Sequence, residues 1–160
     1  MDVRISGLAA AGLALAVDQA TKAAILANAD TLAGGWDVFP GFALVVGRND
    51  GVAFGLLGGT GPWTLVMLAA LILGWLGFAL LQAPRRREAM AYGAIIGGAL
   101  GNVIDRLRYG AVTDFLDLYV GRWHWPAFNF ADIAVVCGAA AIILFDWYAS
   151  QQRKARNSNP

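Results

Sequence analysis

The sequence predicts an all-α membrane protein with four transmembrane helices, a small extracytoplasmic β-hairpin or sheet and a second extracytoplasmic loop. Three observations lead to this fold class. The 160 residues are 58% hydrophobic, with a mean hydropathy of +0.56. Only 14% are charged, against about 25% in soluble domains. Four apolar runs approach the roughly 20 residues that a bilayer span needs. Residues 1–160 are therefore expected to form a single integral-membrane domain.

The predicted spans cover residues 5–29, 62–81, 89–107 and 128–148. The second run contains no charged residue and opens with Pro62, which the first turn of a helix tolerates. The outer segments are then about 30–61 and 108–127. In the first of them, β-prone residues 42–46 and 52–57 flank a Gly-Arg-Asn-Asp-Gly turn, which predicts a small hairpin or sheet on the membrane surface. The second is rich in Leu, Tyr and Trp, so we expect a loop that dips into the lipid headgroups.

The distribution of basic residues predicts the orientation in the membrane. By the positive-inside rule, both termini and the loop between the second and third spans lie in the cytoplasm. The predicted inner segments contain Arg4, Arg85, Arg86, Arg87, Arg153, Lys154 and Arg156, whereas the outer ones contain Arg48, Arg108 and Arg122.

Charged residues interrupt the spans at one common depth. At 1.5 Å per residue, Asp18, Asp105 and Asp132 lie about 20 to 24 Å from the cytoplasmic ends of their spans. Each unpaired charge at the bilayer centre would cost about 2.5 to 3.5 kcal/mol, so these residues need partners or a function. Asp18 and Lys22 share one helix face, as i and i+4. Small residues in the third span let neighbouring helices approach: Gly97, Gly98 and Gly101.

The residue inventory restricts the chemistry. Serine occurs only at predicted cytoplasmic positions, and no HExxH motif is present. The single histidine, His124, cannot build a zinc site, and Cys137 is expected to be a core residue. Paired carboxylates remain, and two adjacent aspartates that share a proton are a complete aspartic-protease apparatus. Spacing alone leaves both Asp105 and Asp114 open as the partner of Asp132.

Two other classes of function are compatible with intramembrane charges. A proton-coupled transporter would carry polar residues in both halves of the membrane and usually internal repeats, which this sequence lacks. A non-catalytic assembly factor would not explain why so many acids share one depth. The formal charge of +1 gives no reason to expect a nucleic-acid partner. No metal or other cofactor is expected.

Five blocks of sequence resemble, in order and spacing, those of the bacterial lipoprotein signal peptidase (signal peptidase II) family. Together they run from residue 18 to residue 132. The blocks are Asp18-Gln19-Ala20-Thr21-Lys22, Asn49-Asp50-Gly51-Val52-Ala53-Phe54-Gly55, Gly97-Gly98-Ala99-Leu100-Gly101-Asn102-Val103-Ile104-Asp105-Arg106, Gly110-Ala111-Val112-Thr113-Asp114-Phe115 and Pro126-Ala127-Phe128-Asn129-Phe130-Ala131-Asp132.

The resemblance implies an intramembrane aspartic endopeptidase with Asp114 and Asp132 as the catalytic pair at the outer face. It implies a bacterial inner-membrane location and a prolipoprotein substrate, cleaved just before a diacylglyceryl-modified cysteine. Membrane lipid and the inhibitor globomycin are implied as ligands, and we expect a monomer. The residues implied to bind substrate or support the site are Asp18, Lys22, Asn49, Gly51, Asn102, Asp105, Arg106 and Asn129.

Overall fold

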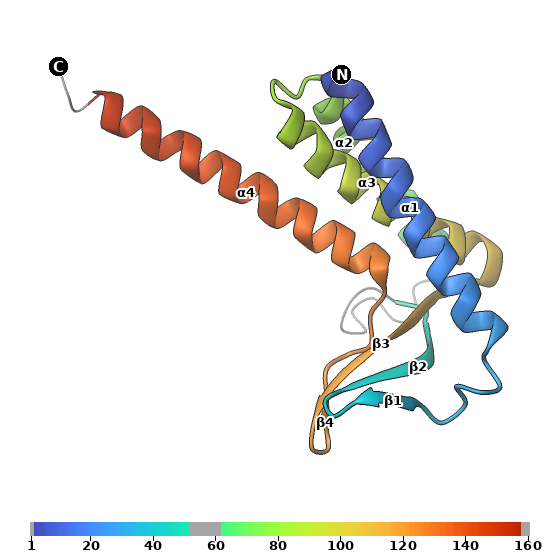
Figure 1. The fold of residues 1–160 in the computed structure, drawn as a ribbon. Helices are drawn as coiled ribbons and strands as arrows, with labels where there is room; N and C mark the ends of the chain where they lie inside the picture. The colour runs from blue at the N-terminus through green and yellow to red at the C-terminus, as the bar shows by residue number, and fades with distance from the viewer. Residues whose placement is uncertain (1, 52–61, 158–160) are drawn as a thin grey trace.

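The computed structural model describes residues 2–51 and 62–157. Within these ranges the chain forms a helical bundle with a small antiparallel sheet at one end (Figure 1). The helices are α1 (Val3–Ala27), α2 (Pro62–Leu81), α3 (Arg86–Tyr109) and α4 (Phe130–Asn157). The helices therefore fall on the four predicted apolar runs, and the bounds of α2 are those predicted.

Three helices of the described part are long and apolar enough to cross a membrane: α1, the Trp63–Leu81 part of α2 and the Phe130–Lys154 part of α4. α3 does not reach that hydropathy because charged residues lie near both of its ends, including Glu88 and Asp105. α3 instead packs against α1, α2 and α4. Much of its surface therefore faces other helices, so its charged residues can be satisfied by protein.

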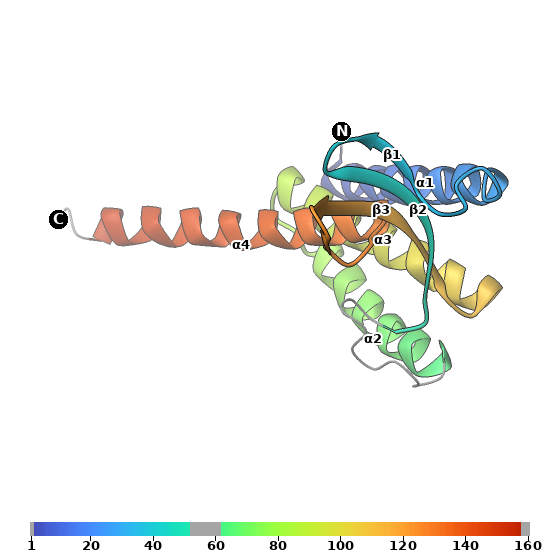
Figure 2. The same ribbon diagram turned by 90° about the horizontal axis from the view of Figure 1, so that it is seen from below.

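Glycines allow α3 to approach its neighbours closely. A Cβ on Gly97 would overlap the backbone oxygen of Ala11 in α1, and one on Gly98 would overlap that of Ala131 in α4. The prediction that small residues on this helix permit close packing is confirmed. Figures 1 and 2 show that α4 leaves the bundle as it runs toward the C-terminus, so its second half extends away from the other helices.

The sheet has the order β1-β2-β3-β4, formed by Trp36–Phe39, Phe42–Asn49, Val112–Val120 and Trp123–His124. All three strand pairs are antiparallel. The chain turns from α3 into β3 at Gly110, whose φ of 74° is a left-handed value that glycine adopts without strain. Phe115 and Leu116 of β3 pack with Ile25 and Leu32 from the end of α1 and the segment after it, which anchors the sheet to the bundle.

The small sheet predicted in the first outer segment is present, but its strand pairing and the prediction for the second outer segment need correction. The strand predicted at 42–46 exists, but it pairs with β1 and β3, and the predicted partner at 52–57 lies outside the described residues. The second outer segment is not a loop, because 112–120 forms strand β3. Its β-branched and aromatic side chains favour a strand, and β2 supplies the pairing edge from a distant part of the sequence.

Candidate active site

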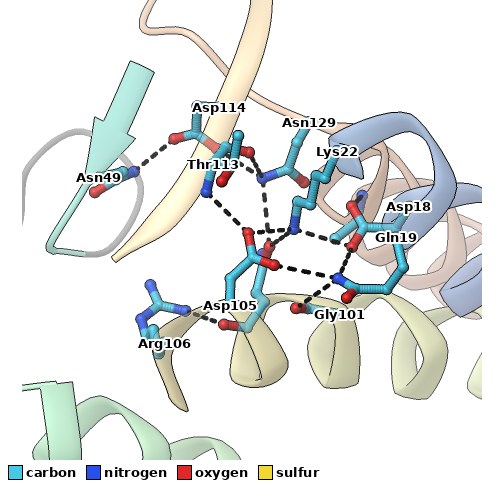
Figure 3. Close-up of polar contacts among 12 residues, drawn as sticks. Asp18, Gln19, Lys22, Asn49, Gly101, Asp105, Arg106, Thr113, Asp114 and Asn129 are labelled. Atoms are coloured by element: carbon cyan, nitrogen blue, oxygen red, sulfur yellow. Dashed lines mark hydrogen bonds and ion pairs between the residues drawn. The ribbon is translucent and has the colours of Figure 1, made fainter. Parts of the chain in front are cut away.

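Asp114 lies on β3, where it is 3% exposed. It pairs in the sheet with Gly47 of β2, where a Cβ would approach the backbone oxygen of Asp114 to 2.9 Å. The glycine therefore lets the two strands come close. Both carboxylate oxygens of Asp114 accept hydrogen bonds from amides: Oδ2 from Asn49 Nδ2 at 2.9 Å and Oδ1 from Asn129 Nδ2 at 2.6 Å. Figure 3 shows the two asparagines on opposite sides of Asp114.

Asp132 lies in the first turn of α4, where it forms a reciprocal cap with Asn129. The backbone N–H of Asn129 donates to Asp132 Oδ2 at 3.1 Å, and the backbone N–H of Asp132 donates to Asn129 Oδ1 at 3.0 Å. This arrangement satisfies backbone donors at the start of a helix in the manner of a capping box. The Asp132 carboxylate accepts a second hydrogen bond, at Oδ1, from Asn102 Nδ2 at 3.0 Å.

Asn129 therefore contacts both aspartates and is itself fully buried. Burial raises the pKa of Asp114 from its ordinary 3.8 to about 6. The hydrogen bond from Asn49 opposes this rise in pKa, whereas the nearby Asp132 carboxylate adds to it. The hydrogen bond from Asn129 and the charge of Lys22 also oppose the rise. The Asp114 carboxyl thus holds its proton to a higher pH than an ordinary aspartate does, as acid–base chemistry with two carboxyls requires.

Both aspartates line one cleft of about 1000 Å³ between the sheet and helices α2, α3 and α4. The polar lining comes from the carboxylates and from Arg48, Asn49, Asp50, Asn102 and Arg106. The apolar lining includes Val103, Leu118, Trp125, Phe128, Ile133 and Val136. An apolar cleft with a few convergent polar groups is the usual form of a binding site.

A buried ionic cluster lies beneath the pair, between α1 and α3. Lys22 Nζ is 2.9 Å from Asp18 Oδ2, 3.2 Å from Asp105 Oδ2 and 2.9 Å from Asn102 Oδ1. Asp18 Oδ1 also accepts the backbone N–H of Ala131 in α4 at 3.0 Å. Its carboxylate lies against Gly101, where any Cβ would overlap it. The polar groups that the sequence placed at one depth on three helices do meet.

Arg106 joins the cleft to the segment that follows β2. Its Nη2 donates to the backbone oxygen of Gly51 at 2.7 Å, and the N–H of Gly51 donates to Asn49 Oδ1 at 3.1 Å. Arg106 thereby holds the backbone beside Asn49, whose other amide end binds Asp114. Every site residue named from the sequence is thus in this region.

Two residues of the site were missed by the sequence reasoning. Gln19 Nε2 lies 3.2 Å from Asp18 Oδ2, 3.3 Å from the backbone oxygen of Gly101 and 3.2 Å from Asp105 Oδ1, so its two N–H groups are shared among three acceptors (Figure 3). A polar residue inside an apolar run was the signal that would have found it. Thr113 acts through its backbone, which donates to Asp105 and accepts from Asn129, so its side chain gave no signal.

The expectation that Cys137 is a core residue is wrong. It is exposed and lines the cleft on the same helix as Asp132. α4 leaves the bundle as it runs toward the C-terminus (Figure 1), and the side chain of Cys137 is not buried against other helices in the described part of the chain.

Comparison with solved structures shows which class of protein has this fold. The chain is similar to a bacterial membrane enzyme solved by the in meso method at 2.3 Å resolution, with a TM-score of 0.80 and 27% identity over 91% of this chain and 90% of that one. A second bacterial membrane enzyme, solved at 1.9 Å, gives a TM-score of 0.74 and 29% identity over 86% of this chain and 90% of the other. The fold is therefore that of a membrane enzyme.

Sequence comparison shows the family. Residues 10–148 match the family described as signal peptidase (SPase) II. The chain is 43% identical to a lipoprotein signal peptidase of Methylobacterium radiotolerans over 157 residues, which are 96% of this chain and 91% of the relative. It is 44% identical to one of Aeromonas hydrophila over 147 residues, 89% of this chain and 87% of the relative. The chain belongs to the signal peptidase II family, and it is a peptidase rather than a transporter or an assembly factor.

Proposed function

We propose that this membrane peptidase removes signal peptides from diacylglyceryl-modified prolipoproteins by cleaving just before the lipidated cysteine, with Asp114 and Asp132 as its catalytic pair. The observation that carries the proposal is the position of Asn129, which hydrogen-bonds both carboxyl groups at the polar end of one cleft. The family membership supports prolipoproteins as the substrate class.

The pair performs the hydrolysis by general acid–base catalysis. The ionised carboxylate takes a proton from a water molecule as the water oxygen attacks the peptide carbonyl, and the protonated carboxyl donates to the carbonyl oxygen. As the tetrahedral intermediate collapses, the C–N bond breaks and the leaving amine takes the proton that the first carboxylate received from water. The other carboxylate takes back a hydroxyl proton from the intermediate, so the pair again holds one proton. Each step needs one ionised and one protonated carboxyl, and the pKa of Asp114 near 6 supports such a division.

The apolar part of the cleft suits the lipid part of the substrate. Leu118, Trp125 and Phe128 come from the sheet side, and Val103 and Val136 come from α3 and α4. Acyl chains are held by apolar surface, at about 25 cal/mol per Å² removed from water. A substrate anchored by its acyl chains in the membrane would thus present the peptide bond next to its cysteine at the polar end of the cleft.

The four helices are proposed as four membrane spans, with α3 crossing inside the bundle. Both termini then lie in the cytoplasm and the sheet and the catalytic pair at the outer face of a bacterial inner membrane, as the basic residues beside α3 and in the tail predict. The chain acts as one peptidase domain of residues 1–160 and as a monomer, and globomycin is its expected inhibitor.

The substrate claim is tested with purified protein in detergent, without any ion gradient. One lipoprotein precursor is prepared with and without the diacylglyceryl group, and cleavage is followed with and without globomycin. We expect the lipidated precursor to be cut before its cysteine, globomycin to stop the reaction, and the unlipidated precursor to be cut poorly. Equal rates for the two precursors would refute lipid recognition.

A further inference from the structure

Lys22 is 2% exposed and is separated from Asp132 of the candidate catalytic pair by one side chain, that of Asn102, which contacts both. An ammonium group has three N–H donors and no acceptor. All three donors have acceptors within hydrogen-bond distance: Asp18 Oδ2, Asp105 Oδ2 and Asn102 Oδ1. Apart from the effect of its charge, Lys22 therefore reaches the pair through the groups that it contacts, and Asn102 is the one that touches Asp132.

The orientation of the Asn102 amide is fixed by its neighbours. Its Oδ1 accepts from Lys22 Nζ at 2.9 Å and from Asn129 Nδ2 at 3.3 Å, and its Nδ2 donates to Asp132 Oδ1 at 3.0 Å. A rotation by half a turn would exchange the amide oxygen and nitrogen. The amide NH₂ would then face a donor-only ammonium, and the amide oxygen would face the Asp132 carboxylate. The ammonium therefore opposes the rotation.

We propose that Lys22 is a positioning residue of the catalytic pair, acting through Asn102 to keep a hydrogen-bond donor on Asp132 and so to hold Asp132 as the ionised member. This inference rests on the proposed function. With the ammonium gone, only the 3.3 Å hydrogen bond from Asn129 Nδ2 still opposes the rotation. The Asn102 amide can then turn its oxygen toward Asp132 and accept a hydrogen bond from the protonated carboxyl. The proton shared by the pair then moves toward Asp132, and fewer molecules contain an ionised base that can activate water.

The pair is surrounded by other charged groups, whose effects the experiment must separate from amide orientation. They are Asp18 on α1, Asp105 and Arg106 on α3, Arg48 near the end of β2, and Asp50 just after β2. Replacing Lys22 alone adds one formal negative charge to its cluster with Asp18 and Asp105. Replacing Asp18 by asparagine in the same chain restores the net charge of the cluster but not the ammonium contact with Asn102.

The test therefore compares Lys22→Met, the charge-balanced double variant Asp18→Asn/Lys22→Met, and Lys154→Met as a control at an exposed lysine. Infrared spectra of the purified proteins at neutral pH report the C=O band of protonated carboxyl groups, and Asp132→Asn identifies the part due to Asp132. This readout needs no substrate, so it stands even if the proposed function fails. The kcat and KM for the lipidated precursor are measured against pH in parallel.

We expect the ratio of protonated to ionised Asp132 to rise about tenfold in both Lys22 variants, the order of effect expected when a charge-assisted hydrogen bond is lost. The acidic limb of the kcat profile should move to higher pH while KM stays within about twofold, and Lys154→Met should match the unaltered protein. If the double variant restores the original band and limb, Lys22 acts by charge alone and the inference is wrong. A lower kcat at every pH with an unmoved limb and band would also overturn it, since that is the signature of a purely structural role.

Discussion

Removal of the Asn49 side chain should raise the pKa of Asp114. Burial raises this pKa from 3.8 to about 6. The largest effect that opposes the rise is the hydrogen bond from Asn49 Nδ2 to Asp114 Oδ2, which is 2.9 Å long. Hydrogen bonds to charged groups stabilise them by about 1.5 to 3 kcal/mol, and 1.36 kcal/mol corresponds to one pKa unit. Asn49→Ala should therefore bring the pKa of Asp114 to about 7 or above, on these magnitudes.

The assay is a titration of ¹³C-labelled aspartate carboxyls in the purified protein, with Asp114→Asn to assign the signal. Asn28→Ala is the matched control, because the Asn28 amide donates to the backbone oxygen of Ala24 on an exposed part of α1 and is not part of the cleft. The Asp114 midpoint should stay near 6 in the control. A midpoint that is unchanged or lower in Asn49→Ala would refute the role given to this hydrogen bond.

Two further predictions concern stability. Folding raises the pKa of Asp114 from 3.8 to about 6. The contribution of Asp114 to the free energy of unfolding is therefore fully present below about pH 4 and is lost as the pH rises through 6. The loss is roughly 3 kcal/mol, at 1.36 kcal/mol per pKa unit. Tm should accordingly fall between pH 4 and 7.5 by more in the unaltered protein than in Asp114→Asn, and parallel curves would contradict this. Gly101→Ala should destabilise the protein by about 1 to 3 kcal/mol, because the new Cβ overlaps the buried Asp18 carboxylate. Gly74→Ala, whose Cβ meets nothing within 4 Å, is its control, and equal Tm values for the two variants would show that the α1–α3 contact is less tight than described.

The helices were predictable because each signal lies within one segment of sequence. An uninterrupted apolar run correctly predicted α2. The shared depth of Asp18, Asp105 and Asp132 correctly predicted that α1, α3 and α4 meet at polar residues. These features depend on helix rise and hydropathy alone, and both are local properties.

The sheet was only partly predictable because its pairing is not local. Phe42–Asn49 pairs with Val112–Val120, and nothing in either segment specifies the other. Asp114 was for the same reason the hardest residue to place: an aspartate in a predicted loop is usually solvated, and only the family resemblance selected it over Asp105. The structure makes it part of a strand whose pairing with Gly47 and contact with Asn129 bury the carboxyl.

The most direct test of the catalytic pair is single-turnover cleavage of one lipidated precursor by Asp114→Asn and by Asp132→Asn, each shown by its unfolding transition to be folded in detergent. Asparagine keeps the shape of the side chain but can neither take the proton of water nor donate that of a carboxyl. Each substitution should lower the cleavage rate by about 100-fold or more, within the range known for loss of general acid–base catalysis. A folded variant that cleaves within a few-fold of the unaltered rate would remove that aspartate from the pair and contradict the mechanism.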